Sequence, residues 1–138
     1  MENNMCNVEK RRYVWFTVIF NLLFLYFKFL TFGWVTIIIL WFFPLYLILY
    51  NIASVLTAKI KNKTKGDYIR FWCLGCLLLL SGLTFCDFGD YGPPAQIIRF
   101  LPYKLSLIIC FSSFCLCIIL SIVSIIIYIL KKKKLSKV

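Results

Sequence analysis

The sequence predicts an all-α integral membrane protein, an up-down four-helix transmembrane bundle with both termini in the cytoplasm. Three observations predict this fold. The 138-residue chain is 62% hydrophobic with a mean hydropathy of +0.90, whereas about half of the residues of a soluble domain are apolar. Its apolar residues form runs of about the 20 residues that cross a bilayer as a helix. Its basic residues gather just outside those runs.

The apolar runs divide the chain into one transmembrane domain, residues 1–138, with spans at about 13–31, 34–56, 71–88 and 105–130. The first span follows Lys10-Arg11-Arg12 and has no small-residue cleavage site, so we expect it to stay uncleaved. Only two residues separate it from the second span, which predicts a tight helical hairpin. Residues 57–70 then form the cytoplasmic loop and residues 89–104 the outer loop.

The basic residues predict the orientation. Thirteen lie on the side of the two termini: Lys10, Arg11, Arg12, Lys59, Lys61, Lys63, Lys65, Arg70, Lys131, Lys132, Lys133, Lys134 and Lys137. The other side holds three, Lys28, Arg99 and Lys104. Because Lys and Arg resist translocation, both termini are expected in the cytoplasm, and basic flanks with short loops favour a bacterial inner membrane. The net charge of the chain is +11, and this pattern predicts that its basic residues interact with anionic lipid headgroups and not with nucleic acid.

Four residues interrupt the apolarity of the first two spans: Asn21, Lys28, Pro44 and Asn51. Lys28 is expected to extend its ammonium group along its methylene stem to the outer headgroups. The alternative is an acidic partner for Lys28 on the same side. Pro44 removes a backbone hydrogen bond and is expected to bend the second span.

Small residues form a stripe along the fourth span, because their spacing of three or four places them on one helix face: Ser106, Cys110, Ser113, Cys117, Ser121 and Ser124. The third span has a similar stripe of Gly75, Leu79, Gly82 and Cys86. Since small residues let helices approach closely in a bilayer, the two stripes are predicted to pack together. Two alternatives remain open: the hydroxyls line a narrow polar path, or the stripe joins two copies of the chain.

Catalytic and metal chemistry is not expected. The chain has no histidine, and the Cys73-x-x-Cys76 pair has no second pair to complete a set of four metal ligands. Seven cysteines cannot all pair, although a disulfide between Cys86 and Cys110 is conceivable. Of the five acids, Glu2, Glu9 and Asp67 lie in basic segments as counter-charges. We therefore predict a non-enzyme with no metal and no cofactor.

The outer loop is the one sizeable outward surface that the sequence predicts. Gly92-Pro93-Pro94 favours a turn, and residues 95–101 carry apolar residues at helical spacing, so a short amphipathic helix is expected before Pro102. The loop is either a lid whose acids pair with nearby cations, or a surface that recognises a partner. In the second case the partner-binding residues are predicted to be Asp87, Asp90, Tyr91 and Arg99.

These observations lead to one main functional hypothesis and two alternatives. The main hypothesis is a protein that binds a protein partner within the bilayer or at its outer face. One concrete version is an immunity protein against a membrane-inserting toxin, by analogy with other small, basic bundles that have short loops. The first alternative is a small transport or channel component whose polar path includes Asn21, Lys28, Pro44, Asn51 and the small-residue stripe. The second is an accessory subunit of a membrane complex.

Overall fold

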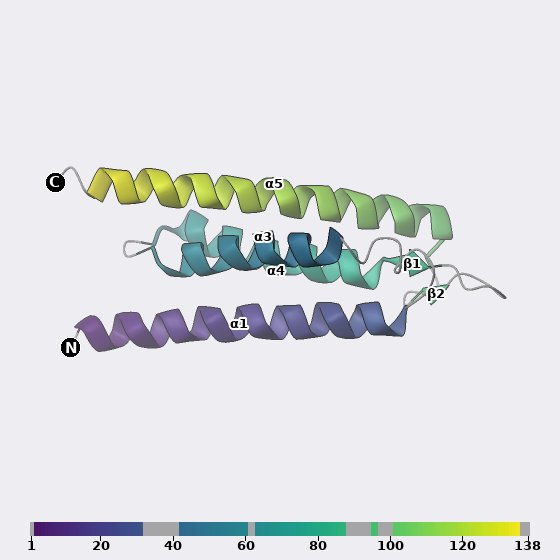
Figure 1. Ribbon diagram of the computed structural model, residues 1–138, viewed down its shortest axis with the longest axis horizontal. Coiled ribbons are helices and arrows are strands. Elements are labelled where there is room, and N and C mark those ends of the chain that lie inside the picture. Colours follow the sequence, from purple (N-terminus) through teal and green to yellow (C-terminus); the bar gives the residue numbers. More distant parts are fainter. Residues whose placement is uncertain (1, 32–41, 61–62, 88–94, 97–100, 136–138) are drawn as a thin grey trace.

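The computed structural model describes residues 2–31, 42–60, 63–87, 95–96 and 101–135. These residues form four helices and two short strands: α1 (Glu2–Leu30), α3 (Phe42–Ala58), α4 (Lys65–Leu83), β1 (Cys86–Asp87), β2 (Ala95–Gln96) and α5 (Tyr103–Leu135). The helices lie side by side in one bundle, with the start of α1 and the end of α5 at the same end (Figure 1). The prediction of a helical bundle is confirmed.

Three of the helices are long and apolar enough to cross a bilayer: Lys10–Leu30, Lys65–Leu83 and Tyr103–Lys133. The fourth, α3, is apolar but has 17 residues, and the first part of the second predicted span, residues 34–41, lies outside the described residues. Large apolar side chains such as Leu22, Phe29 and Ile108 are exposed on the outside of the bundle. The hydrocarbon interior of a bilayer can surround such an apolar surface at a low cost in free energy.

Helix ends differ from the predicted span limits because capping groups, rather than hydropathy, decide them. Helix α4 begins at Lys65, inside the expected cytoplasmic loop, since the Asp67 carboxylate accepts hydrogen bonds from the Thr64 N–H and hydroxyl at 2.7 and 2.9 Å. It ends at Leu83 instead of near residue 88. There, the Thr84 N–H and hydroxyl both donate to the Leu80 carbonyl, at 3.0 and 2.7 Å.

The connection between α4 and α5 contains an antiparallel ribbon. Strand β1 pairs with β2 in the register Cys86 to Gln96 and Asp87 to Ala95. The expected short helix over residues 95–101 is therefore wrong at its first two residues, and residues 97–100 lie outside the described part of the chain. The physical reason is that the backbone groups of residues 86–87 and 95–96 bond to each other across the connection, which prevents the bonds within one segment that a helix needs.

The small-residue stripe of α5 is buried along its whole length, with all six members at most 8% exposed. Three of them donate to backbone carbonyls of the α4 segment: Ser106 to Thr84 at 2.8 Å, Cys110 to Ser81 at 3.4 Å and Cys117 to Leu74 at 3.9 Å. The stripe therefore packs on α4, through the face that carries Leu74 and Ser81.

The predicted partner of that stripe was the glycine face of α4, and this pairing is wrong. A Cβ atom on Gly75 would lie 2.4 Å from the Phe20 ring of α1, and one on Gly82 would lie 3.1 Å from the Phe24 ring. Both glycines therefore make room for phenyl rings of α1. A phenyl ring of α1 fits where α4 has a glycine without a side chain. The Ser and Cys side chains of α5 are small and pack where they can donate to a backbone carbonyl of α4.

The Cys110 thiol donates to the Ser81 carbonyl at 3.4 Å, and the disulfide with Cys86 that the sequence allowed stays a prediction, because the side chain of Cys86 lies outside the described part of the chain.

Candidate functional site

The two ends of the bundle differ in chemistry. We call one the basic end: it comprises the starts of α1 and α4, Lys59 after α3 and the end of α5. We call the other the ribbon end: it comprises the end of α1, the starts of α3 and α5, and the strands β1 and β2 (Figure 1). Each end holds a charged residue that is buried, Asp67 at the basic end and Lys28 at the ribbon end.

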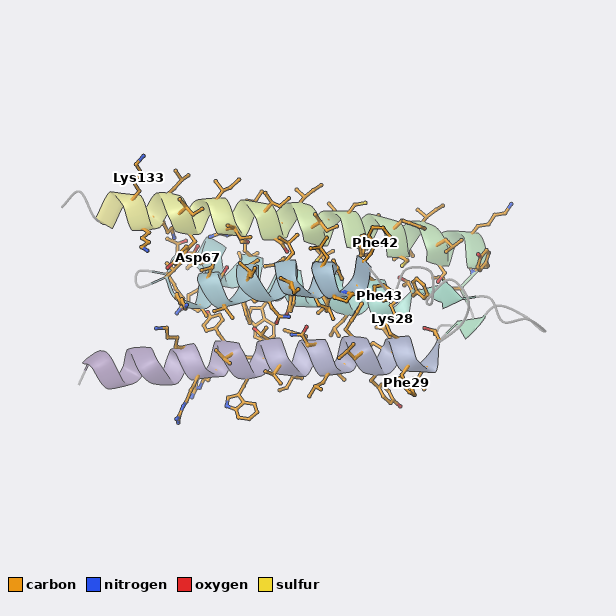
Figure 2. The ribbon with its side chains drawn as sticks, viewed as in Figure 1. Lys28, Phe29, Phe42, Phe43, Asp67 and Lys133 are labelled. Carbon is orange, nitrogen blue, oxygen red and sulfur yellow. The ribbon has the colours of Figure 1, made fainter. Side chains whose placement is uncertain are left out.

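Lys28 lies inside the ribbon end, only 6% exposed. Its ammonium nitrogen is 2.9 Å from the ring centroid of Phe85, 4.8 Å from that of Phe43 and 5.7 Å from that of Phe24. Figure 2 shows Lys28 and Phe43 close together between α1 and α3. The expectation that Lys28 extends to the headgroups is therefore wrong, because rings from three segments surround the cation and their negative faces attract it.

The predicted partner-binding residues belong to the chain next to this buried cation. Phe85, which contacts Lys28, is followed directly by β1, and the backbone of Asp87 lies in that strand beside the start of α5. Asp90, Tyr91 and Arg99 lie outside the described residues. The β1–β2 pairing fixes where the segment with Asp90 and Tyr91 leaves and rejoins the bundle.

Asn21 and Asn51, which the sequence marked as polar interruptions, form a pair between α1 and α3. Asn21 Nδ2 donates to Asn51 Oδ1 at 2.8 Å, and Asn51 Nδ2 donates back to Asn21 Oδ1 at 3.3 Å. Each amide also donates to a carbonyl of its own helix, Thr17 at 2.8 Å and Leu47 at 2.7 Å. The two amides thus satisfy each other and fix the register of α1 against α3.

We expect Asn21→Leu to lower the free energy of unfolding by about 1 kcal/mol, because it leaves the Asn51 amide without its partner inside the bundle. The double variant Asn21→Leu/Asn51→Leu should recover much of this loss, since two apolar side chains leave no polar group unsatisfied. The measurement is unfolding with sodium dodecyl sulfate in dodecyl maltoside micelles. A double variant whose loss equals the sum of the two single losses would contradict the mutual pairing.

Asp67 is the site residue that sequence reasoning missed. It was interpreted as a counter-charge in a loop, but its side chain is fully buried and accepts hydrogen bonds from four groups. Besides the Thr64 N–H and hydroxyl, these are the Arg70 guanidinium and the Lys131 ammonium, the latter at 2.5 Å. Figure 2 shows Asp67 at the basic end, facing α5. The spacing Thr64-x-x-Asp67 resembles a capping box and could have indicated this role.

The polar side chains described above mainly contact one another inside the bundle. No group of three His, Cys, Asp or Glu residues suited to a metal ion occurs among the described residues. The two thiols of the Cys73-x-x-Cys76 pair are free and exposed on α4. What the arrangement can do chemically is hold helices in register, keep a cation under phenyl rings and present charged ends.

Comparisons of the chain with protein-family models, with curated proteins and with solved structures find no match.

Proposed function

We propose that the chain is a multi-pass protein of a bacterial inner membrane, with the basic end in the cytoplasm, that binds a protein partner at its ribbon end without catalysing a reaction. The orientation is supported by the thirteen basic residues of the terminal side against three on the other. In this orientation the ribbon end lies at the outer face of the membrane, where the segment with Asp90, Tyr91 and Arg99 meets other proteins.

The β1–β2 ribbon is the observation that carries this proposal. A connection that only joins two helices needs a short turn, whereas this one pairs Cys86 with Gln96 and Asp87 with Ala95. The ribbon is also anchored to α5, because the Ser106 hydroxyl donates to the carbonyl of Thr84, two residues before β1. Residues 88–94 join the strands, so the carboxylate of Asp90 and the ring of Tyr91 belong to a segment with fixed ends. Such segments on a rigid scaffold favour recognition.

The concrete form of the proposal is an immunity protein, which protects its own cell by binding a toxin that inserts into the membrane. A binding role of this kind requires a stable bundle and an outward polar segment but no catalytic group. The described bundle interior fits the requirement for stability, because Phe24, Leu74, Leu78 and Cys117 are at most 1% exposed. The analogy is to a class of small basic membrane proteins and does not extend to any particular toxin.

The transport alternative receives less support from the contacts. Its polar path would use Asn21, Asn51 and the small-residue stripe, yet the two amides bond to each other. Within the stripe, Cys110 and Cys117 donate to carbonyls of α4, and Ser106 donates to the carbonyl of Thr84, directly after α4. Side chains used in this way hold helices together. A transport path along them would require these bonds to break during each cycle.

The proposal is tested by photo-crosslinking in living cells, with benzoylphenylalanine at position 91 of the tagged full chain. We expect a discrete protein adduct at this position, lost when Asp87→Asn, Asp90→Asn and Arg99→Gln are combined. The same probe at Tyr26, which is 59% exposed on α1, is the control and should give no discrete protein adduct because lipid covers that surface. The triple variant should reach the membrane in normal amount, so that loss of the adduct reports lost recognition and not lost insertion.

An adduct that survives the triple replacement, or that appears equally at position 26, would contradict recognition by this segment. A phenotype that responds to Asn21→Leu but not to the triple replacement would favour transport instead.

A further inference from the structure

Exposed cations surround the basic end of the bundle, and we call them the cationic ring. All are exposed, and they come from every helix or from the residue that follows it: Lys10, Arg11 and Arg12 on α1, Lys59 after α3, Lys65 on α4 and Lys132 on α5. These residues are far apart in the sequence, so the antiparallel arrangement of the helices is what gathers them at one end (Figure 1).

The described carboxylate of this end, that of Asp67, does not neutralise the cationic ring. Among the described side chains of the basic end, Asp67 is the one carboxylate, and it is fully buried. Its two ion pairs are with Arg70 and Lys131, neither of which belongs to the cationic ring. Asp67 therefore balances charge inside the bundle, and the charge of the cationic ring faces outward.

Exposed aromatic side chains follow the cationic ring toward the middle of the bundle. Trp15 lies one turn after Arg12 on α1 and is 65% exposed, while Trp72 on α4 is 45% exposed. The Trp72 ring packs against Phe16 with centroids 5.0 Å apart, which links the aromatic side chains of α1 and α4. Exposed tryptophan between a cationic and an apolar surface is typical of the headgroup level of a bilayer.

We propose that the cationic ring is a binding site for the headgroups of anionic phospholipids. The phosphodiester oxygens would accept hydrogen bonds from the Lys ammonium and Arg guanidinium groups, and the acyl chains would lie along the apolar surface beyond Trp15 and Trp72. The aromatic side chains decide in favour of a lipid over a nucleic acid, because a nucleic acid offers phosphates without the adjoining hydrocarbon. This inference goes beyond partner binding at the ribbon end and does not depend on it.

The test is native mass spectrometry of the purified full chain in detergent, titrated with phosphatidylglycerol or phosphatidylcholine of the same acyl chains. Lys132→Gln and Lys104→Gln form a matched pair, since both lysines are exposed on α5 but lie at opposite ends. We expect Lys132→Gln to weaken phosphatidylglycerol binding about fivefold, because one Lys or Arg near an anionic headgroup contributes about 1 kcal/mol. Lys104→Gln should leave binding unchanged, and neither change should affect phosphatidylcholine.

A variant with Lys10, Arg11 and Arg12 all replaced by Gln should weaken phosphatidylglycerol binding by roughly a hundredfold, if three such contributions add. Circular dichroism of the same sample shows whether the helices are retained. Equal phosphatidylglycerol binding by the wild type and this variant, or an equal loss in Lys104→Gln, would overturn the proposal. So would displacement of phosphatidylglycerol by a single-stranded oligonucleotide at equal phosphate concentration, which would indicate a general polyanion site.

Discussion

Asp67→Asn should lower the free energy of unfolding by about 3 kcal/mol, because it removes the single charge that balances Arg70 and Lys131. The carboxylate is fully buried and joins two helices, since Lys131 lies on α5 and is separated from Asp67 by 64 positions in the sequence. The replacement also weakens the cap at the start of α4, where Asp67 accepts from Thr64. The measurement is equilibrium unfolding in mixed micelles, followed by circular dichroism.

The control for this prediction is Lys131→Gln, which we expect to lower stability by no more than about 1 kcal/mol. The Lys131 side chain is 33% exposed, so water screens its charge and solvates it when its partner is lost. Combining Asp67→Asn with Arg70→Gln and Lys131→Gln should be less harmful than Asp67→Asn alone, because no uncompensated cation remains. Equal effects of Asp67→Asn and Lys131→Gln would show that the buried carboxylate has no special role.

Gly75→Leu should separate α1 from α4 and lower the free energy of unfolding by about 3 kcal/mol. Even a Cβ atom at this position would lie 2.4 Å from the Phe20 ring, and that ring is itself buried and stacked edge-on against Trp72 at 6.0 Å. The ring cannot move without losing its own contacts. The same unfolding measurement checks the prediction, with intrinsic tryptophan fluorescence as a local reporter of the Trp72 environment.

Gly66→Leu is the matched control, because it makes the same change in the first turn of the same helix. There the nearest atom to a new Cβ is Thr64 Oγ1 at 3.8 Å, so we expect no loss of stability and a gain of up to about 1 kcal/mol from helix propensity. Combining Gly75→Leu with Phe20→Ala should restore part of the stability, since the smaller side chain frees the required space. A Gly75→Leu variant as stable as the wild type would contradict the close packing of α1 on α4.

The sequence predicted well those features that depend on neighbours along the chain. Apolar runs predicted the helical bundle, and the spacing of Ser106 through Ser124 predicted a buried stripe on α5. The partner face of that stripe could not be predicted in the same way. Leu74 and Gly75 are adjacent on α4, yet the Leu74 carbonyl accepts a hydrogen bond from Cys117 of α5, whereas Gly75 faces the Phe20 ring of α1. Neighbouring residues of a helix point in different directions, so a shift of one position changes which helix they contact.

The candidate sites show the same division. The sequence placed Asp87, Asp90, Tyr91 and Arg99 in one outer segment, and the structure adds the ribbon that holds the ends of residues 88–94 together. The position of Asp90, Tyr91 and Arg99 in a recognition surface stays a prediction. Lys28 was expected at the headgroups because a span with one charge normally orients it toward water. The rings of Phe43 and Phe85, from other parts of the chain, reverse that preference.

By itself, the sequence determined that this is a helical protein with apolar helices long enough for a membrane and with one strongly basic side, because hydropathy and charge are sums over local residues. Only the tertiary structure decided which polar groups meet: Asn21 with Asn51, Asp67 with Lys131, and Lys28 with its phenyl rings. The physical reason is that a buried polar or charged group is stable only with a partner. For each of these three groups a partner lies on another segment, at a distance along the chain that no local pattern encodes.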